Sequence, residues 1–466
     1  MKLSRLFRAV SVAVLLAGPA AALDLEEAIL HVLETNPDIE AAEADKQALE
    51  FELDRAHAFW SPKLVVDGWA GSSRDFGERS SGPGDPVEGY ELKATITQQL
   101  FDGYWTKSEV ARQAYRVDAA ALRVLERSEF LALEATRLYA DVLRMRKQVG
   151  LARENLSYHG EVVTRLRDAF ETGVVGPGDL TQGEERLLVA EELLLQFQLD
   201  LSDAEAMFLQ VVGVEPGGLS NVPGVGRAVP GSLEQVLANA RRTNPTIRFM
   251  QADVGAAEAL RRRAESNQYP TLNLEAQGRY GEDVEGVEGK VNDVSLGLRF
   301  RYEIQGGAQR AERQEQVRRV NESRARLLSQ TRLVEREVRQ SWNIRRQVGE
   351  RVRILGDQVS ELRELRGIYE TEFLVGNRSL LDVLNTQNSL LSAEVGLVNE
   401  QSLRTYIDYR VLAASGVLLR TLGIEPPVDA EPYAANHVGA PAVSAAQTGK
   451  RFDARSYRNW RKKVSD

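Results

Sequence analysis

The sequence predicts a mainly α-helical protein with a membrane β-barrel, built from two tandem repeats of long helices that flank a strand hairpin. Three observations predict this fold class: residues that recur at a constant offset, long segments with coiled-coil periodicity, and short segments in which apolar and polar residues alternate. The repeat decides the architecture first, because each repeated unit is expected to form the same supersecondary structure.

The repeat is clearest at two helix boundaries, TNPDI at 35–39 and TNPTI at 243–247. Asn caps the free amides of a helix and Pro suits the first helical position, so each stretch predicts one helix ending and another beginning. The copies are offset by 208 positions there and by 203 positions past the first hundred residues. We therefore predict a first repeat over 23–212, a linker over 213–231 and a second repeat over 232–423.

Composition indicates an exported protein. Residues 1–22 have the order of a secretory signal peptide, with basic residues before an apolar run and a small-residue cleavage site. No later stretch approaches the roughly 20 apolar residues of a membrane-spanning helix. The chain has no cysteine, which excludes disulfides, thiolate metal sites and an acylated N-terminal cysteine. The net charge of −9 over 466 residues argues against nucleic acid as a partner.

The longest segments of each repeat have apolar residues at alternating steps of three and four, which is the period of a coiled coil. No proline interrupts residues 105–172, so a helix there could approach about 100 Å in length. The opposite face of the second repeat, between 310 and 366, mixes Arg and Glu. Mixed signs favour a solvated helix face over a nucleic-acid surface. So narrow an apolar seam must pack on helices of the other repeat and of other chains.

Four segments are predicted to be strands, at about 63–72 and 90–100 in the first repeat and about 271–280 and 293–304 in the second. Apolar and polar residues alternate in the last three, as in transmembrane strands with one lipid face and one aqueous face. The alternative is an ordinary half-buried hairpin in a soluble domain. The signal peptide, the aromatic strand ends and the polar loops favour the membrane.

Four strands cannot close a barrel, and an open sheet edge is not tolerated in lipid. Several copies of the chain must therefore share one barrel. The polar strand positions that we expect to line its lumen are Lys93, Arg279, Arg299 and Arg301.

These tandem repeats, together with the turn pattern Gly-x5-Asp in each, resemble the TolC family of outer-membrane efflux and secretion channels from Leu23 to about Gly423. The resemblance implies a homotrimer whose chains share a twelve-stranded barrel, continued by a periplasmic α-helical barrel, in the outer membrane of a Gram-negative bacterium. It implies a passive exit duct of a tripartite export system. The implied partners are outer-membrane lipid, a periplasmic adaptor (membrane fusion protein) and an inner-membrane ABC or proton-driven transporter.

The turn pattern predicts a tight helical hairpin in each repeat. In the second repeat, Gly376 suits the left-handed position that ends a helix, Ser379 suits the N-cap, and Asp382 favours the first turn of the next helix. The corresponding residues of the first repeat are Gly173 as the stop, Gly176 as the cap, Pro177 at the first position and Asp179 in the first turn.

By resemblance, the two hairpins form the periplasmic tip of the channel, which the family keeps shut with aspartate rings and with links made by a Tyr and an Arg. Phe373 stands where the family often has Tyr, and Asn385 stands where a second acidic ring can lie. The alternative is that the two aspartates only cap helices. The candidate gate residues are Asp382, Arg378, Asn385, Phe373 and Asp179.

An enzyme is not indicated. The four histidines show no metal-ligand spacing, and we find no nucleophile–base pair, phosphate loop, cofactor motif or metal motif. The alternative function is a periplasmic coiled-coil adaptor or scaffold protein of an export complex. Residues 424–466 are predicted to be a disordered basic periplasmic tail. The cargo stays open between type I protein secretion and multidrug efflux, and the missing lipoprotein cysteine mildly favours secretion.

Overall fold

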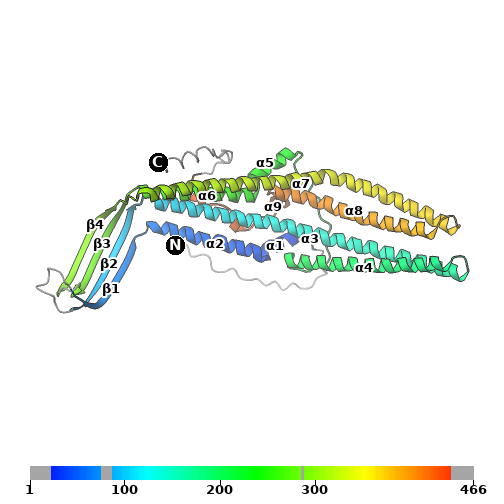
Figure 1. Ribbon diagram of the computed structural model, residues 1–466, viewed down its shortest axis with the longest axis horizontal. Coiled ribbons are helices and arrows are strands. Elements are labelled where there is room, and N and C mark those ends of the chain that lie inside the picture. Colours follow the sequence, from blue (N-terminus) through cyan, green and yellow to red (C-terminus); the bar gives the residue numbers. More distant parts are fainter. Residues whose placement is uncertain (1–22, 75–86, 285–287, 442–466) are drawn as a thin grey trace. The chain divides into compact units, whose positions relative to one another are not determined.

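The computed structural model describes residues 23–74, 87–284 and 288–441, in which long helices accompany one antiparallel sheet (Figure 1). Residues 1–22, where we predict a signal peptide, lie outside the described part. The chain divides into two compact units. Unit 1 comprises the residues up to Pro37, Ser128–Ala240 and Arg336–Pro426, and unit 2 comprises Asp38–Arg127, Arg241–Glu335 and the residues from Pro427. Both repeats contribute to each unit, so the units do not coincide with the repeats.

The elements of the second repeat follow the same order as those of the first. The first repeat forms α1 (Leu25–Thr35), α2 (Pro37–His57), η1 (Ala58–Trp60), β1 (Lys63–Ser73), β2 (Val87–Phe101), α3 (Trp105–Glu171) and α4 (Pro177–Val212). The second repeat forms α5 (Leu233–Thr243), α6 (Pro245–Glu265), η2 (Ser266–Gln268), β3 (Thr271–Glu282), β4 (Lys290–Arg301), α7 (Gly306–Leu374) and α8 (Leu380–Ala414). The chain continues through α9 (Leu418–Leu422), η4 (Val428–Ala430) and α10 (Ala434–His437).

The two Asn-Pro boundaries divide helices as predicted. α1 ends before Asn36, and α2 begins at Pro37. In the second copy, the Asn244 side chain accepts a hydrogen bond of 3.2 Å from the amide of Ile247, and Pro245 takes the first position of α6. The cap satisfies an amide that has no partner within its own helix. Among the described residues, no helix is long and apolar enough to cross a membrane.

Unit 2 contains the sheet, whose strand order is β1-β2-β3-β4 with antiparallel neighbours (Figure 1). The strand positions differ from the predicted ones by up to three residues. The differences of three residues are at the start of β2 and at both ends of β4. β4 stops at Arg301 because the next residues form the connection into α7. Within the described residues, no strand pairs with the outer edge of β1 or of β4.

Small residues let the helices of unit 2 approach closely. Ala114, Val117 and Ala120 of α3 pack with Leu49 and Leu53 of α2 in one buried cluster. α6 lies so near α3 that a Cβ atom added at position 255, a glycine, would come within 2.6 Å of an aromatic ring of α3. This contact explains a glycine in the interior of a helix, where it costs about 1 kcal/mol relative to alanine.

The prediction of a disordered tail from residue 424 is wrong for residues 424–441. Ile424 is buried, and η4 and α10 follow it. Ala434 and Ala435 are also buried, because their small side chains fit against the alanine-rich face of α3. A segment rich in Ala and Pro is not expected to form a core of its own. Here the surface against which it packs is provided by other helices. Residues 442–466 lie outside the described part.

Candidate functional site

Unit 1 contains the two helical hairpins that the turn pattern predicts. α3 and α4 form the first hairpin, and α7 and α8 form the second. Gly173 has a φ of 71° and Gly376 a φ of 78°, as the left-handed stop position requires. In the first turn, the amide of Gly173 bonds the carbonyl of Phe170, and the amide of Val174 bonds the carbonyl of Ala169.

The second turn has the same pair of bonds, from Gly376 to Phe373 and from Asn377 to Glu372. Both turns are therefore Schellman motifs, in which one glycine satisfies the last carbonyls of a long helix. Both turns have the geometry that a helix stop at these glycines requires.

The helices that follow the turns start as predicted, but with different caps. Gly176 is the N-cap of α4, with Pro177 at the first position and no side-chain bond. Ser379 is the N-cap of α8, and its Oγ accepts a bond of 3.2 Å from the amide of Asp382. The same hydroxyl donates a bond of 2.8 Å to Oδ2 of Asp382. Asp382 therefore takes part in the start of α8, and Asp179 occupies the corresponding first turn of α4.

Arg378 contacts three groups of the second hairpin. Its Nε donates a bond of 2.9 Å to Glu372, its guanidinium lies 4.1 Å from the centre of the Tyr369 ring, and its Nη1 is 3.8 Å from Oδ2 of Asp382. The hydrogen bond to Glu372 raises the pKa of Arg378 above its ordinary value. The arrangement holds a cation beside Asp382 and partly compensates its charge.

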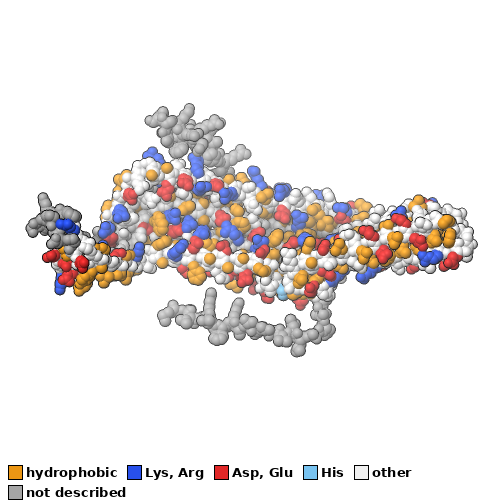
Figure 2. All heavy atoms as spheres, turned by 60° about the horizontal axis from the view of Figure 1, so that its bottom comes forward, with side chains coloured by type: hydrophobic (Ala, Val, Ile, Leu, Met, Phe, Trp, Pro, Cys, Tyr) orange, Lys and Arg blue, Asp and Glu red, His pale blue; other side chains and the backbone are white. Residues whose placement is uncertain are grey.

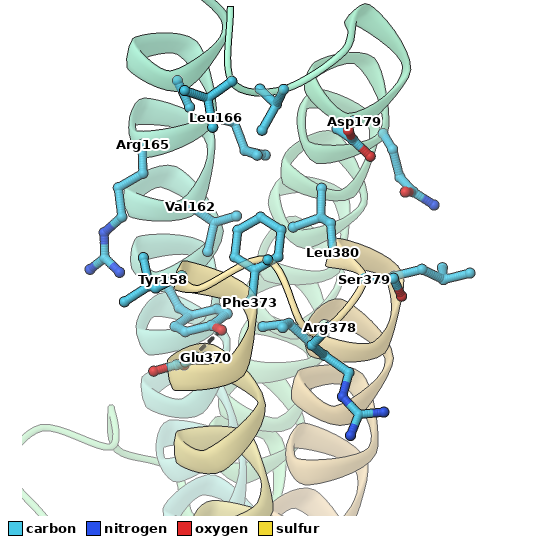
Figure 3. A pocket seen from close by; sticks show the side chains of 18 residues that line it. Tyr158, Val162, Arg165, Leu166, Asp179, Glu370, Phe373, Arg378, Ser379 and Leu380 are labelled. Atoms are coloured by element: carbon cyan, nitrogen blue, oxygen red, sulfur yellow. Dashed lines mark hydrogen bonds between the residues drawn. The ribbon is translucent and has the colours of Figure 1, made fainter. Parts of the chain in front are cut away.

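A cavity of about 440 Å³ lies between the two hairpins of unit 1 (Figure 3). Figure 3 shows Phe373 at its centre, near Val162 and Leu380, while Arg378 points away. Phe373 also packs against the buried cluster of Leu166, Leu380 and Leu384. A Phe at this position therefore joins the hairpins by apolar contact, where a Tyr could also have donated a hydrogen bond.

The structure brings only some of the predicted gate residues to this cavity. Asp179, Phe373 and Arg378 line it. Asp382 and Asn385 are not among its lining residues, and Asn385 is exposed on α8.

The polar contacts that join the hairpins involve residues that the sequence analysis missed. The Tyr158 hydroxyl donates a bond of 2.8 Å to Glu370, and the Arg366 guanidinium lies 5.1 Å from the centre of the Tyr158 ring. Burial, together with the bond to Glu370, raises the pKa of the Tyr158 phenol, so it stays protonated as a donor. Gln387 donates a buried bond of 2.8 Å to Asn155 and accepts one of 2.9 Å from Arg366. We call these five residues the hairpin clamp.

One signal could have revealed the clamp. Gln387 stands in the apolar series of α8, seven residues after Leu380 and three before Leu390. A polar side chain in such a seam needs a partner, because burying it without one costs free energy. The partner itself, Asn155, lies 232 residues away.

The four residues predicted to face a lumen lie on one face of the sheet. Lys93 pairs with Arg279 and Arg279 with Asp293, while Thr271 pairs with Arg301 and Asn273 with Arg299. Directly paired residues of neighbouring strands share a face, and the face repeats every second residue. Arg279 lies 3.1 Å from Glu91 and 3.3 Å from Asp293, and Arg299 lies 2.7 Å from Glu275.

The opposite face of the sheet is apolar and uncovered in the single chain. Val294, Leu296, Leu298 and Phe300 of β4 are 66–88% exposed, and Leu64 of β1 is 61% exposed. Figure 2 shows hydrophobic side chains gathered along the sheet at the left of the view. A continuous apolar face of this kind marks an interaction surface for protein or membrane. Among the described residues, no group of three or more His, Cys, Asp or Glu residues could hold a metal ion.

Paired helical hairpins with a two-faced sheet define the class of outer-membrane channel proteins. The family described as "Outer membrane efflux protein" matches residues 28–214 and 236–416. The chain therefore belongs to this family, whose members are channels and not enzymes, and the predicted relationship is confirmed. It is an outer-membrane exit duct with a large periplasmic helical part. The alternative prediction of a periplasmic adaptor or scaffold is wrong, because the chain matches the outer-membrane channel family over most of its length.

Individual relatives agree with the family. "Outer membrane efflux protein BepC" of Brucella suis biovar 1 is 28% identical over 341 residues, which cover 71% of this chain and 74% of BepC. "Protein CyaE" of Bordetella pertussis is 26% identical over 329 residues, which cover 68% of each protein.

The crystal structure of the outer membrane protein VceC of Vibrio cholerae matches 84% of this chain and 96% of VceC, with a TM-score of 0.74 and 18% identity. The open state of the MtrE channel of Neisseria gonorrhoeae matches with a TM-score of 0.70 and 17% identity, over 85% of this chain and 89% of MtrE. These likenesses show the TolC-like channel fold.

Proposed function

We propose that three copies of the chain close a twelve-stranded barrel in the outer membrane and continue it as a periplasmic α-helical barrel. The observation that carries this proposal is the sheet, which in the described residues has four strands, two unpaired edges and one exposed apolar face. Lipid offers no hydrogen bonds to an open edge, so β1 of one chain must pair with β4 of the next. Lipid would then cover the apolar face.

The charged face of the sheet would line the lumen. Arg279 and Arg299 are each paired with carboxylates, so their charges are largely compensated. Lys93 and Arg301 share this face. A lumen of mixed sign suits a duct that passes solutes without selecting strongly for one charge.

A disulfide scan tests the closed trimer. Within one chain, β1 and β4 are three strand spacings apart, or about 14 Å, whereas disulfides join Cα atoms about 4.4–6.8 Å apart. A bond between these strands must therefore join two chains, and the chain has no cysteine of its own. Val66→Cys in β1 is combined in turn with Leu296→Cys, Leu298→Cys or Phe300→Cys in β4.

After oxidation in the membrane, we expect one combination to give covalent dimers and trimers and nothing larger. Val66→Cys alone is the control and should give neither product. A series that continues beyond three chains, or no product from any combination, would contradict the closed trimer.

The gate is the second part of the proposal. Aspartate rings at the tip draw cations into the opening by an electrostatic effect that salt weakens. Asp382→Ala should raise single-channel conductance or reduce block by multivalent cations, with little loss of folded trimer. Asp179→Ala should mainly loosen the first hairpin. Identical cation block for wild type and Asp382→Ala in planar bilayers would leave Asp382 only its role at the start of α8.

The hairpin clamp completes the gate. Its bonds join the two hairpins of one chain, so the second hairpin cannot swing outward without breaking them. A partner that competes for these contacts would therefore favour the open state. We assign that role to a periplasmic adaptor, recruited together with an inner-membrane ABC or proton-driven transporter.

The cargo follows from the transporter. BepC is named as an efflux protein, and efflux and type I protein secretion use the same duct architecture. Cross-linking in cells, followed by purification of the trimer and mass spectrometry, identifies the inner-membrane partner. An ABC transporter supports protein secretion, and a proton-driven pump supports multidrug efflux.

A further inference from the structure

The cavity between the two hairpins of unit 1 has the size and the lining of a small-molecule site. Each hairpin supplies nine of its 18 lining residues, and ten of the 18 are Ala, Val, Leu or Phe. Small-molecule sites have volumes of about 300–1,000 Å³ and are mainly apolar, with a few polar groups that orient the ligand. The volume of about 440 Å³ therefore suits a small molecule with an apolar body.

The apolar lining leaves hydrophobic area for such a molecule to cover. Val174 and Leu374 both line the cavity, yet they are 77% and 73% exposed in the single chain. Figure 3 shows the Phe373 ring at the centre, near Val162 and Leu380. Covering exposed apolar side chains favours binding, and an aromatic ring can in addition stack on Phe373. The lining thus favours an aromatic body.

The two arginines that line the cavity are compensated outside it. Arg165 lies 3.4 Å from Glu161, and Arg378 lies 2.8 Å from Glu372. Figure 3 shows both arginine side chains directed away from Phe373. Neither guanidinium therefore offers a free positive charge to a guest in the cavity.

The two carboxylates that line the cavity differ in their partners. Glu370 accepts the hydrogen bond of Tyr158 and lies 3.4 Å from Nε of Arg366. Asp179 also lines the cavity, and within the described part of the chain it forms no ion pair. Asp179 is thus the one lining carboxylate there whose charge has no cation beside it, and a cationic guest complements it.

We propose that this cavity binds a small organic cation with an aromatic body, whose ring packs on Phe373 and whose ammonium group pairs with Asp179. Because the ligand would touch both hairpins, separating them would break part of its contacts. It therefore binds the arrangement described here more tightly than an open one and holds the hairpins together. This effect on opening rests on the proposed gate, whereas the binding itself does not.

Calorimetric titration of the purified full-length protein tests the binding, with detergent alone as the blank. Naphthylethylamine is the cationic probe, and naphthylacetate has the same ring system with the opposite charge. We expect the anion to bind at least about tenfold more weakly, because only the cation can form a charge-assisted hydrogen bond with Asp179. Asp179→Asn removes the charge and nearly keeps the shape, so it should abolish most of the preference for the cation.

A second pair of variants tests the location. Ala169→Phe places a ring in the cavity and should weaken the binding of both probes at least about tenfold, since the apolar body loses its space. Thr181→Phe is the matched control, because Thr181 is exposed on α4 and does not line the cavity. It should leave both affinities unchanged.

Single-channel recording tests the effect on opening. At ten times its Kd, a ligand that binds only the closed arrangement favours it about 11-fold in each chain. Naphthylethylamine should therefore lower the open probability of the wild type and change that of Ala169→Phe little. Block of the pore at Asp382 would persist in Ala169→Phe, so this variant separates the two effects.

Equal affinity of the wild type for the two probes would overturn the proposal, and so would wild-type affinity in Ala169→Phe. Binding of neither probe would also overturn it, and is the result expected if a neighbouring copy fills the cavity. If Ala169→Phe does not assemble, Asp179→Asn decides alone.

Failure of the proposed gate gives a different result. Tyr158→Phe removes a bond between the hairpins and should raise the open probability if they gate the channel. Unchanged open probability both with bound probe and in Tyr158→Phe would refute the gate and leave the binding site in place. A rise in Tyr158→Phe without an effect of the bound probe would refute the holding of the hairpins by the ligand.

Discussion

Replacing Tyr158 with phenylalanine should make the channel open more readily. The change removes the hydroxyl that donates a bond of 2.8 Å to Glu370. It keeps the ring, which packs beside Val162 in the cavity and under the guanidinium of Arg366. The substitution therefore tests one hydrogen bond of the hairpin clamp with little change in packing.

The size of the effect follows from the exposure of the partner. A hydrogen bond to a charged group contributes about 1.5–3 kcal/mol, and a neutral one about 1 kcal/mol. The Glu370 side chain is 34% exposed, so water replaces part of the lost bond, and we use about 1 kcal/mol. That corresponds to a roughly fivefold shift toward the open hairpin in each chain. If the three chains of the proposed trimer open together, the shifts multiply to about 100-fold.

Single-channel recording of trimers in planar bilayers measures this shift as open probability. Tyr139→Phe is the matched control, because it removes a phenol of unit 1 that bonds the carbonyls of Leu23 and Ser220 and takes no part in the clamp. The control should lower stability and leave open probability unchanged. The double variant Glu370→Gln/Tyr158→Phe should change the free energy of opening by less than the sum of the changes that the two single substitutions cause.

An open probability for Tyr158→Phe equal to that of the wild type would refute the clamp. An equal rise for Tyr139→Phe would also refute it, since loosening of unit 1 anywhere would then suffice.

Three further predictions concern other parts of the chain. Leu384→Ala should lower the free energy of unfolding by about 2–5 kcal/mol, because Leu384 is fully buried between the hairpins. Leu381→Ala, at an exposed position of the same helix, should lower it by about 0.5 kcal/mol or less. Thermal unfolding of the two variants measures the difference. Burial raises the pKa of Glu129 from 4.5 to about 7, so its protonation stabilises the fold at pH 5 and this contribution is lost as the pH rises through 7. Between pH 5 and 8, the free energy of unfolding of the wild type should then fall by up to about 3 kcal/mol relative to that of Glu129→Gln. Parallel pH profiles of the melting temperature for the two proteins would contradict this. In reconstituted trimers, Arg299→Cys should react with a small aqueous thiol reagent and Leu298→Cys should not, and the reverse pattern would refute the assignment of the two faces.

Local chemistry let the sequence predict the helix stops of the two hairpins, the cap of α8 and the two faces of the strands. Gly173 and Gly376 stop helices because only glycine readily takes the left-handed position. Ser379 caps α8 because a hydroxyl there satisfies a free amide. The alternation in the strands assigned Arg279 and Arg299 to the charged face before any register was known, because side chains of a strand point to the two faces in turn.

Contacts between distant segments were decided only by the tertiary structure. Asn155 and Gln387 meet across 232 residues, and each helix taken alone shows only a polar residue in an apolar seam. Residues 424–441 were mispredicted as a disordered tail for the same reason. The alanines of this segment form no core by themselves and become buried only against α2, α3 and α6, where Asp118 of α3 accepts bonds from the first amides of α10. A residue's own sequence neighbourhood sets its backbone conformation and its face, whereas its partners depend on the rotation and register of the packed helices, which the whole core determines together.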